Sequence, residues 1–358
     1  MKRIVMLYAV LAGNLPCMPA QEINMIYTAE WQLNFQKKMN VCNLLRLDAN
    51  IPALKGGEVN AATIHLYKTK TERITGDWQV FSNIEEDNLY AGIAVLGYTQ
   101  RIGNTQLFLG IRNLNEDYFI APGMSLFSNS SCGIFPTISA NYPIANYPLS
   151  GICIDYKIHL NHWLIQSSIY GGKAYNGWNR HNNPFIINLR DNGIFSITES
   201  NYGTDYGRYF MGFALHNRMH LCYEDAKQKV LEKEEKKVSF AWWAYLEQTL
   251  WRIKKREINL LAQYSQSYHI TDGCTRYMEI GSTYKQYDNP EKAYHLGVSV
   301  QYAGYTYGTE VSTEMTYRKH FGTAFFIQPA FHLARNKYGW HSTLSVRLSC
   351  MINFSPRE

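Results

Sequence analysis

The sequence has no long apolar run after its N-terminal segment, although it is 358 residues long. A helix that crosses a membrane needs about 20 consecutive apolar residues, so the class of helical membrane proteins is excluded for the remainder of the chain. Charged residues are also scarce, at 18%, and no concentrated patch of Lys and Arg indicates nucleic-acid binding. No linker rich in Pro, Gly or Ser and no low-complexity tract divides the chain, which indicates one domain.

Sequence motifs of enzymes and metal sites are missing as well. The chain contains no Gly-rich phosphate loop, no G-x-S-x-G and no H-E-x-x-H. His216 and His220, with Cys222 nearby, have ligand-type side chains, but their place at a strand end and loop favours a chance grouping over a metal site. The cysteines have no paired short spacing and leave any disulfide pairing open. We therefore expect no enzyme activity, no metal and no cofactor.

What the chain has instead is many aromatic residues, with 27 Tyr and 8 Trp, and a hydrophobicity that alternates residue by residue. In the last segment the apolar positions are Leu344, Val346, Leu348, Cys350, Ile352 and Phe354. Polar residues stand between most of them: Ser345, Arg347, Ser349 and Asn353. Successive strand side chains point to opposite faces, so such a segment has one face suited to lipid and one suited to water. This pattern is typical of transmembrane β-barrels.

About sixteen segments alternate in this way, and many are long enough to cross a bilayer. Their approximate spans are 25–36, 42–53, 61–69, 89–103, 105–114, 149–159, 162–173, 193–204, 205–217, 239–253, 256–268, 274–286, 292–306, 310–322, 323–336 and 343–354. Short joins alternate with the long connections 70–88, 115–148, 174–192 and 218–238. We therefore predict an all-β, antiparallel, up-and-down transmembrane barrel with short periplasmic turns and longer external loops.

The N-terminal segment has the features of a secretory signal. Lys2 and Arg3 precede the apolar run 4–13, and Met18-Pro19-Ala20 resembles a cleavage site. We expect residues 1–20 to be a signal peptide and residues 21–358 to form a barrel domain in the bacterial outer membrane, in contact with its lipid. A lipid anchor on Cys17 is the less favoured alternative, because the residues before it make a poor lipobox.

The longest connection, 115–148, is unusually apolar for a segment between strands. Its apolar residues include Tyr118, Phe119, Ile120, Phe127, Ile134, Phe135 and Ile138. An apolar loop of this length is costly in water, so we expect it to fold into the barrel mouth and to narrow the channel.

Two other connections carry many charges. Asp77, Glu85, Glu86 and Asp87 gather in one loop, and we interpret them as solvated loop acids. The run 223–237 is rich in Lys and Glu and is predicted to form an external loop or a short helix.

Several short motifs resemble those of one known family. Residues 76–85 read Gly-Asp-Trp-Gln-Val-Phe-Ser-Asn-Ile-Glu, and residues 109–119 end a strand in Asn-Glu-Asp-Tyr-Phe. Residues 127–133 read Phe-Ser-Asn-Ser-Ser-Cys-Gly, Tyr147-Pro148 precedes a strand, and residues 169–172 read Ile-Tyr-Gly-Gly. In this order they are similar to motifs of the carbohydrate-selective porins of the OprB type, and the similarity runs on weakly to the end of the chain.

The resemblance implies a sixteen-stranded outer-membrane porin that passes sugars passively through a lumen narrowed by inward loops and charged residues. It brings no enzyme chemistry. The chain departs from the family at Cys132, where Phe is usual, and at Gly172, which follows Gly171 where Asp-Gly is expected. It is also shorter than typical members, and four residues follow Phe354.

We accordingly expect a porin for small hydrophilic solutes, with mono- or small oligosaccharides as the first choice. A general, non-selective porin for ions and small solutes is the alternative of the same class, and a plugged structural or adhesin barrel is the alternative of another class. The expected partners are the solutes and outer-membrane lipid, with no nucleic acid and a possible homo-oligomer. Which sugar passes, the pore size and the oligomeric state stay open.

Four residues are predicted to line or brace the constriction. Arg112 and Arg347 lie at the polar parity of their strands, like Asp155 and Lys157, and simple lumen hydration is the alternative role for such charges. Sugars present many hydroxyls, so we expect Arg112 and Arg347 to donate hydrogen bonds to them. Asp117 and Asn129 are expected to hold residues 115–148 inward.

Overall fold

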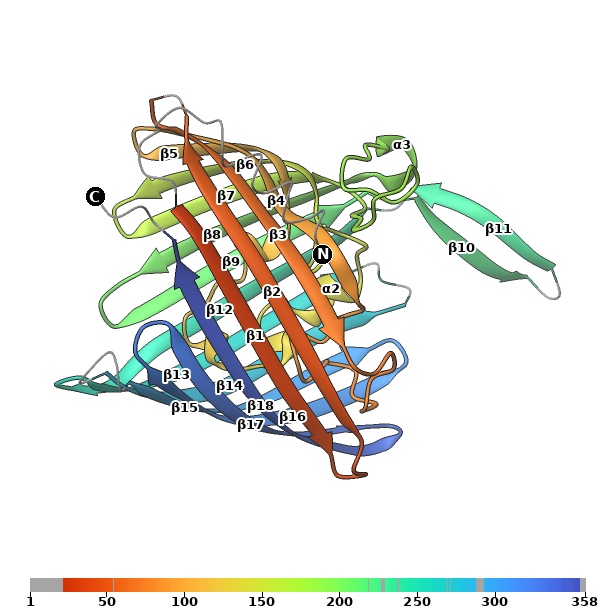
Figure 1. The fold of residues 1–358 in the computed structure, drawn as a ribbon. Coiled ribbons are helices and arrows are strands. Elements are labelled where there is room, and N and C mark those ends of the chain that lie inside the picture. The colour runs from red at the N-terminus through yellow and green to blue at the C-terminus, as the bar shows by residue number, and fades with distance from the viewer. Residues whose placement is uncertain are drawn as a thin grey trace.

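The computed structural model describes residues 22–53, 55–217, 219–226, 229–236, 238–268, 270, 272–287 and 293–354. The signal peptide predicted over residues 1–20 lies outside the described residues. Within them, sixteen antiparallel strands close into one barrel (Figure 1). The first eight of these strands are β1 (Glu22–Asn34), β2 (Met39–Pro52), β3 (Gly57–Lys68), β4 (Leu89–Ile102), β5 (Thr105–Arg112), β6 (Gly151–Leu160), β7 (Trp163–Gly171) and β8 (Ile194–Gly203). The second eight are β9 (Gly207–His216), β12 (Ser239–Ile253), β13 (Arg256–Tyr268), β14 (Cys274–Gln286), β15 (Tyr294–Tyr305), β16 (Gly308–Phe321), β17 (Phe325–Asn336) and β18 (Gly339–Asn353).

Each strand pairs with its neighbours along the barrel order, and β1 closes the barrel on β18. The closing register places Glu30 opposite Arg347. Closure leaves no unpaired strand edge, which is what a sheet in lipid requires. The predicted fold class is therefore confirmed, and the predicted spans agree with the strands to within a few residues.

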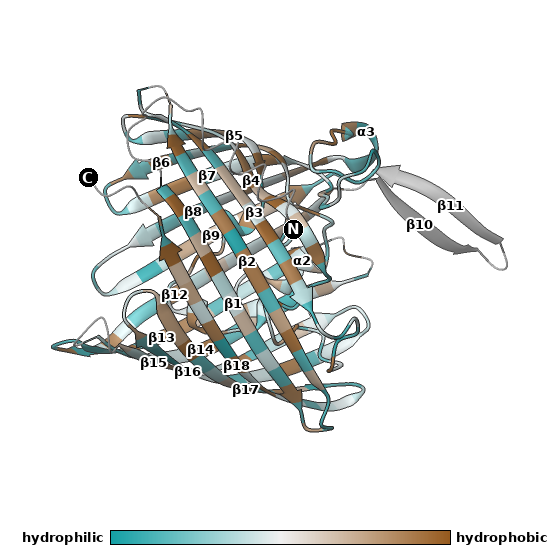
Figure 2. Cartoon of the chain, in the orientation of Figure 1, coloured by the Kyte–Doolittle hydropathy of each residue, from teal (hydrophilic) through white to brown (hydrophobic). Residues whose placement is uncertain are grey.

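The two faces of the wall differ as the alternation predicts. In β18, Leu344 is 45% exposed on the outer face, whereas Ser345 and Arg347 on the inner face are buried. In β6 the same contrast separates exposed Ile154 from buried Asp155. Figure 2 shows hydrophobic and hydrophilic residues interleaved along the strands. Since exposed apolar side chains face outward, the barrel presents a lipid-compatible outer surface, and its inner face carries polar side chains such as Asp155 and Arg347.

The connections are of very unequal length in the first part of the barrel. Two-residue turns join β6 to β7 and β12 to β13, and Asn161 and Lys254 adopt the positive φ that tight hairpins need, at 50° and 54°. Long segments link β3 to β4, β5 to β6 and β7 to β8. From β13 onward the connections are short at both ends, so the predicted alternation of short and long connections holds only up to that strand.

The charged run 223–237 is not a loop or short helix, as the sequence analysis expected. Its described residues belong to an antiparallel hairpin of β10 (Met219–Ala226) and β11 (Lys229–Lys236), which projects from the barrel (Figure 1). The hairpin continues from β9 and leads into β12, which are antiparallel neighbours in the wall. A chain that leaves one strand and returns to the next can extend the same ladder, so no helix is needed to connect them.

Helices are short in the part of the chain that the structure describes. The longest are α2 (Pro136–Ser139) and α3 (Leu189–Asn192), with three 3₁₀ turns, η1 (Leu114–Glu116), η2 (Met124–Leu126) and η3 (Ser130–Cys132). None of these helices is long and apolar enough to cross a membrane.

The hydrophobic core lies inside the barrel, between its wall and the segment 113–150, hereafter the inner loop. Phe119 of this loop packs on Phe135 and on Trp243 of β12, with ring centroids 5.3 and 5.0 Å apart. The helix α2 lies against β13 and β14. Each fully buried apolar side chain of this size contributes roughly 1.5–3 kcal/mol. The expectation that the apolar connection folds into the barrel is therefore confirmed.

Candidate functional site

The inner loop begins at a cluster of four charges on the lumen side of β5 and β6. Arg112 ends β5, and its Nη1 donates to Asp117 of the loop and to Asp155 Oδ2 of β6 at 3.1 Å. Lys157 of β6 donates to Asp117 as well and lies 3.8 Å from Asp155. Alternation along β6 brings Asp155 and Lys157 to the same face. The cluster therefore ties the first turn of the inner loop to two adjacent strands.

The Arg112 guanidinium is further oriented by an aromatic ring. Its Cζ lies 3.9 Å from the ring centroid of Phe108, which precedes Arg112 by four residues and so lies on the same face of β5. Only 8% of Arg112 is exposed, and its Nε has no hydrogen-bond partner among the described residues. Most of this guanidinium is thus engaged by carboxylates and a ring, and it acts first as a brace.

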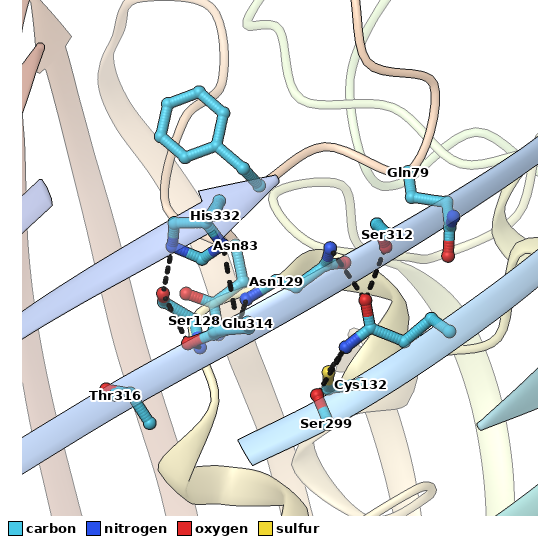
Figure 3. A network of polar contacts seen from close by, with 12 residues as sticks. Gln79, Asn83, Ser128, Asn129, Cys132, Ser299, Ser312, Glu314, Thr316 and His332 are labelled. Carbon is cyan, nitrogen blue, oxygen red and sulfur yellow. Dashed lines mark hydrogen bonds and ion pairs between the residues drawn. The ribbon is translucent and has the colours of Figure 1, made fainter. Parts of the chain in front are cut away.

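The middle of the inner loop is held by a carboxylate of β16. Glu314 Oε1 accepts from the backbone N–H of Ser128 at 2.8 Å and from its hydroxyl at 3.0 Å, and Oε2 accepts from the backbone N–H of Asn129 at 2.9 Å (Figure 3). The Asn129 side chain accepts from Ser131 N at 2.9 Å and donates to Gln301 of β15 at 3.4 Å. Hydrogen bonds to a charged acceptor are stronger than neutral ones, so Glu314 is the main latch of this region.

A second carboxylate of β16 holds the segment 69–88, hereafter the upper loop. Glu310 lies four residues before Glu314 and therefore on the same face of the strand. It accepts from the backbone N–H groups of Trp78 at 2.7 Å and Gln79 at 2.8 Å, and from Asn336 of β17 at 2.8 Å. One strand thus presents two carboxylates to two different loops.

Arg347 of β18 also contacts the upper loop. Its Nε donates to Glu30 Oε2 at 2.7 Å, and its Nη2 donates to Asn83 Oδ1 of the upper loop at 2.9 Å. The backbone N–H of Asn83 in turn donates to the carbonyl of Ser128 at 2.7 Å. Arg347 is therefore connected through Asn83 to the part of the inner loop that Glu314 holds.

The structure thus brings the four predicted site residues into two groups. Arg112 and Asp117 are in direct contact at β5 and β6, whereas Asn129 and Arg347 are linked through the upper loop at β16, β18 and β1. All four belong to the contacts between wall and loops. The hypothesis that the two arginines donate to sugar hydroxyls stays a prediction.

Sequence reasoning missed the carboxylates that hold the loops. Besides Glu310 and Glu314, Glu247 of β12 accepts from Gly123 N at 3.1 Å, and Glu279 of β14 accepts from the Cys132 thiol at 3.2 Å. Each acid occupies a lumen position of its strand, as Glu279 does between Met278 and Ile280. That alternation was the available signal, but it does not say which lumen acids meet a loop.

Two acids of the upper loop are buried, against the interpretation that all four are solvated. Asp77 and Glu85 are 5% and 4% exposed, whereas Glu86 and Asp87 are exposed. Asp77 accepts from Phe81 N at 2.8 Å and pairs with Arg73 at 3.0 Å. Burial raises the pKa of Glu85, partly offset by Arg73 and Lys68. The upper loop is folded against the wall, which removes these side chains from water.

Below the inner loop, the lumen wall forms a polar pocket of about 330 Å³. Asp117, Lys157, Gln166, Glu199 and Asn201 contribute to its lining. They offer both donors and acceptors, which uncharged polyols need.

The cysteines whose side chains the structure describes are free thiols: Cys42, Cys132, Cys153, Cys274 and Cys350. No group of His, Cys, Asp and Glu among the described residues is arranged to hold a metal ion.

No family model matches the chain, and no curated protein matches its sequence. Among solved structures, the high-pH structure of Pseudomonas putida OprB is similar, with a TM-score of 0.75 at 13% identity over 93% of this chain and 94% of that chain. A loop-deletion mutant of OmpT, an outer membrane protein of Vibrio cholerae, has a TM-score of 0.59 at 7% identity over 93% and 99%. A mutant of Rh. blastica porin has a TM-score of 0.55 at 6% identity over 93% and 100%.

At these identities the similarity concerns the fold. The chain has the architecture of outer-membrane porins, and the resemblance to the OprB type that its motifs indicate is confirmed at that level. Antiparallel barrels with an apolar outer face are the fold of bacterial outer membranes, in agreement with the predicted location.

Proposed function

We propose that the chain is an outer-membrane porin through which small hydrophilic solutes, mono- or small oligosaccharides first, diffuse passively. The observation that carries the proposal is a polar lumen in which an inner loop is held across the channel by Glu314 and the Arg112 cluster. A lumen of this kind narrows the passage and surrounds it with hydrogen-bonding groups, which is how porins filter solutes.

Sugar preference is supported by the chemistry of the lumen wall. The pocket below the inner loop combines amides, such as Gln166 and Asn201, with charged side chains. Sugars carry many hydroxyls and no charge, so a dense set of donors and acceptors suits them. A general porin needs no such density and is the second candidate.

A plugged barrel is the candidate of a different class. It is favoured by the two loops that pack inside the lumen, since Phe119, Phe135 and Phe81 are all buried there.

Liposome swelling separates the three candidates. Swelling that depends on glucose and falls steeply with larger sugars supports the proposal, equal swelling with every small solute supports a general porin, and no swelling by correctly folded protein overturns both channel candidates.

Replacement of Arg112 by alanine is expected to change sugar flux and single-channel conductance without preventing barrel assembly. The variant removes the guanidinium that joins Asp117 to Asp155. The two carboxylates then keep Lys157 as their cationic partner, and the start of the inner loop is held less tightly. Flux is measured by swelling and assembly by the altered gel migration of unboiled protein. Arg101→Ala, which removes a cation paired with Glu58 on the wall, is the control. Unchanged conductance and sugar block in Arg112→Ala and Arg347→Ala together would remove both arginines from the site.

A further inference from the structure

Three basic residues stand side by side across three adjacent strands. The ladder registers pair Lys285 of β14 with His295 of β15, and His295 with Arg318 of β16. His320 is the next residue on the same face of β16, and its ring lies 5.4 Å from that of His295. These four residues, Lys285, His295, Arg318 and His320, are hereafter the basic row, which sets an ammonium, a guanidinium and two imidazoles on one face of the sheet.

The basic row has little acidic compensation. Lys285 lies 3.4 Å from Glu247 and 3.7 Å from Glu257, which neutralise that end of the row. Among ion pairs between described residues, none includes Arg318, His295 or His320. Glu314 precedes Arg318 by four residues on the same face of β16, but both of its oxygens accept hydrogen bonds from the inner loop. The end of the row at β16 therefore keeps its positive charge.

Arg318 is held in place by neutral groups only. Its Nε donates to Gln328 Oε1 at 2.8 Å, and its Nη2 donates to the carbonyls of Ser125 at 2.9 Å and Leu126 at 3.4 Å. Its Cζ lies 4.6 Å from the ring centroid of Phe326. A guanidinium has five N–H donors, so this arrangement orients the group and leaves its Nη1 donors unengaged among the described residues.

The basic row lies on the far side of the inner loop along the channel, where it can meet a passing solute. Arg318 and His320 lie near the end of β16, beyond the tip of the inner loop at Ser125 and Leu126, and toward the short turn before β17. If the strands run as the predicted topology requires, this is the periplasmic side of the narrowing. A solute that has passed the inner loop therefore meets the basic row next.

We propose that Lys285, His295, Arg318 and His320 form a binding station for oxyanions, such as the phosphate or carboxylate group of an acidic sugar, on the periplasmic side of the inner loop. The inference rests on the proposed channel function and extends its solutes to anionic sugar derivatives. Guanidinium, ammonium and imidazole groups on one face match the donors that a phosphate or carboxylate accepts from. An anion there also supplies the carboxylate-like partner that Arg318 lacks among the described residues.

The test uses inorganic phosphate as the probe and has two readouts. The first is the temperature at which unboiled protein loses its compact gel migration, with and without phosphate, which reports binding whether or not the barrel conducts. The second is block of the chloride current by phosphate in planar bilayers. Arg318→Gln/His295→Gln/His320→Gln is the variant, because it removes the cation that has no carboxylate partner and leaves Lys285 with Glu247 and Glu257. The comparison with and without phosphate within each protein cancels any stability that the variant loses at Ser125 and Leu126. Arg335→Gln, which removes a cation from an exposed position over Trp340, is the matched control.

We expect phosphate to stabilise and block the wild type and the control, and to act at least about tenfold more weakly on the triple variant, since the loss of one charge-assisted contact already costs roughly that factor. Equal phosphate effects on the variant and the wild type, or no phosphate effect on either, would overturn the station. A folded barrel that binds phosphate but carries no current would contradict the channel function and leave the binding station standing.

Discussion

Replacement of Glu314 by alanine is expected to raise single-channel conductance several-fold. The side chain accepts three hydrogen bonds from Ser128 and Asn129, and its removal leaves two backbone N–H groups without their acceptor. Each hydrogen bond to a charged group contributes about 1.5–3 kcal/mol. The apolar parts of the inner loop stay packed on the wall, so the variant frees the segment around Ser128 rather than the whole loop.

The control for this experiment is Glu58→Ala. Glu58 is another wall carboxylate, but its partners are Arg101 and Asn60, which belong to the wall and not to a loop. Both variants remove one negative charge, so a change of conductance caused by charge alone appears in both. Equal conductance of the two variants, or a conductance of Glu314→Ala no higher than that of the wild type, would show that Glu314 does not hold the inner loop in the channel.

Arg347→Ala is expected to cause the largest loss of stability. Glu30 is fully buried, and Arg347 is its ion-pair partner, at 2.6 Å through Nη2. Removal of one member of a buried pair leaves an uncompensated charge and costs about 3–5 kcal/mol. The variant also loses the contact with Asn83 of the upper loop. The temperature at which unboiled protein loses its compact gel migration should fall markedly.

A double variant distinguishes the stranded charge from the loss of packing. In Glu30→Gln/Arg347→Gln neither side chain is charged, and both can still exchange a hydrogen bond across the closing pair of β1 and β18. We expect this variant to recover much of the stability that Arg347→Ala loses. If the double variant is as unstable as Arg347→Ala, the effect comes from packing or from Asn83, and the buried pair is not the cause.

Much of the wall could be predicted from the sequence because the lipid requires it. Every second residue of a strand such as β18 must be apolar where it meets the acyl chains, and this period of two also marks where the strand begins and ends. The strands β12, β13 and β14 have the predicted bounds. The same requirement does not act on residues outside the bilayer, which is why the hairpin of β10 and β11 was expected to be a loop or helix.

The loops inside the lumen could be predicted only in outline. The apolar content of residues 115–148 indicated burial, but the acceptor of Asn129 N is Glu314, 185 residues away. That contact depends on how the closed barrel places β16 opposite the inner loop, and no local pattern encodes it. For the same reason Asp77 and Glu85 were interpreted as solvated, although both are buried: Asp77 is bonded within the upper loop, and Glu85 accepts from Asn40 of β2 at 3.4 Å.

We infer that loops held by wall carboxylates narrow the lumen to a passage for sugars. Glucose-driven swelling of liposomes that contain the wild type or Glu314→Ala, measured side by side with a series of longer oligosaccharides, tests it most directly. We predict that the wild type admits glucose and excludes the longer sugars, and that Glu314→Ala admits sugars that the wild type excludes. Absence of glucose-driven swelling by folded wild-type protein, or the same size limit in both proteins, would contradict a lumen that the loops narrow.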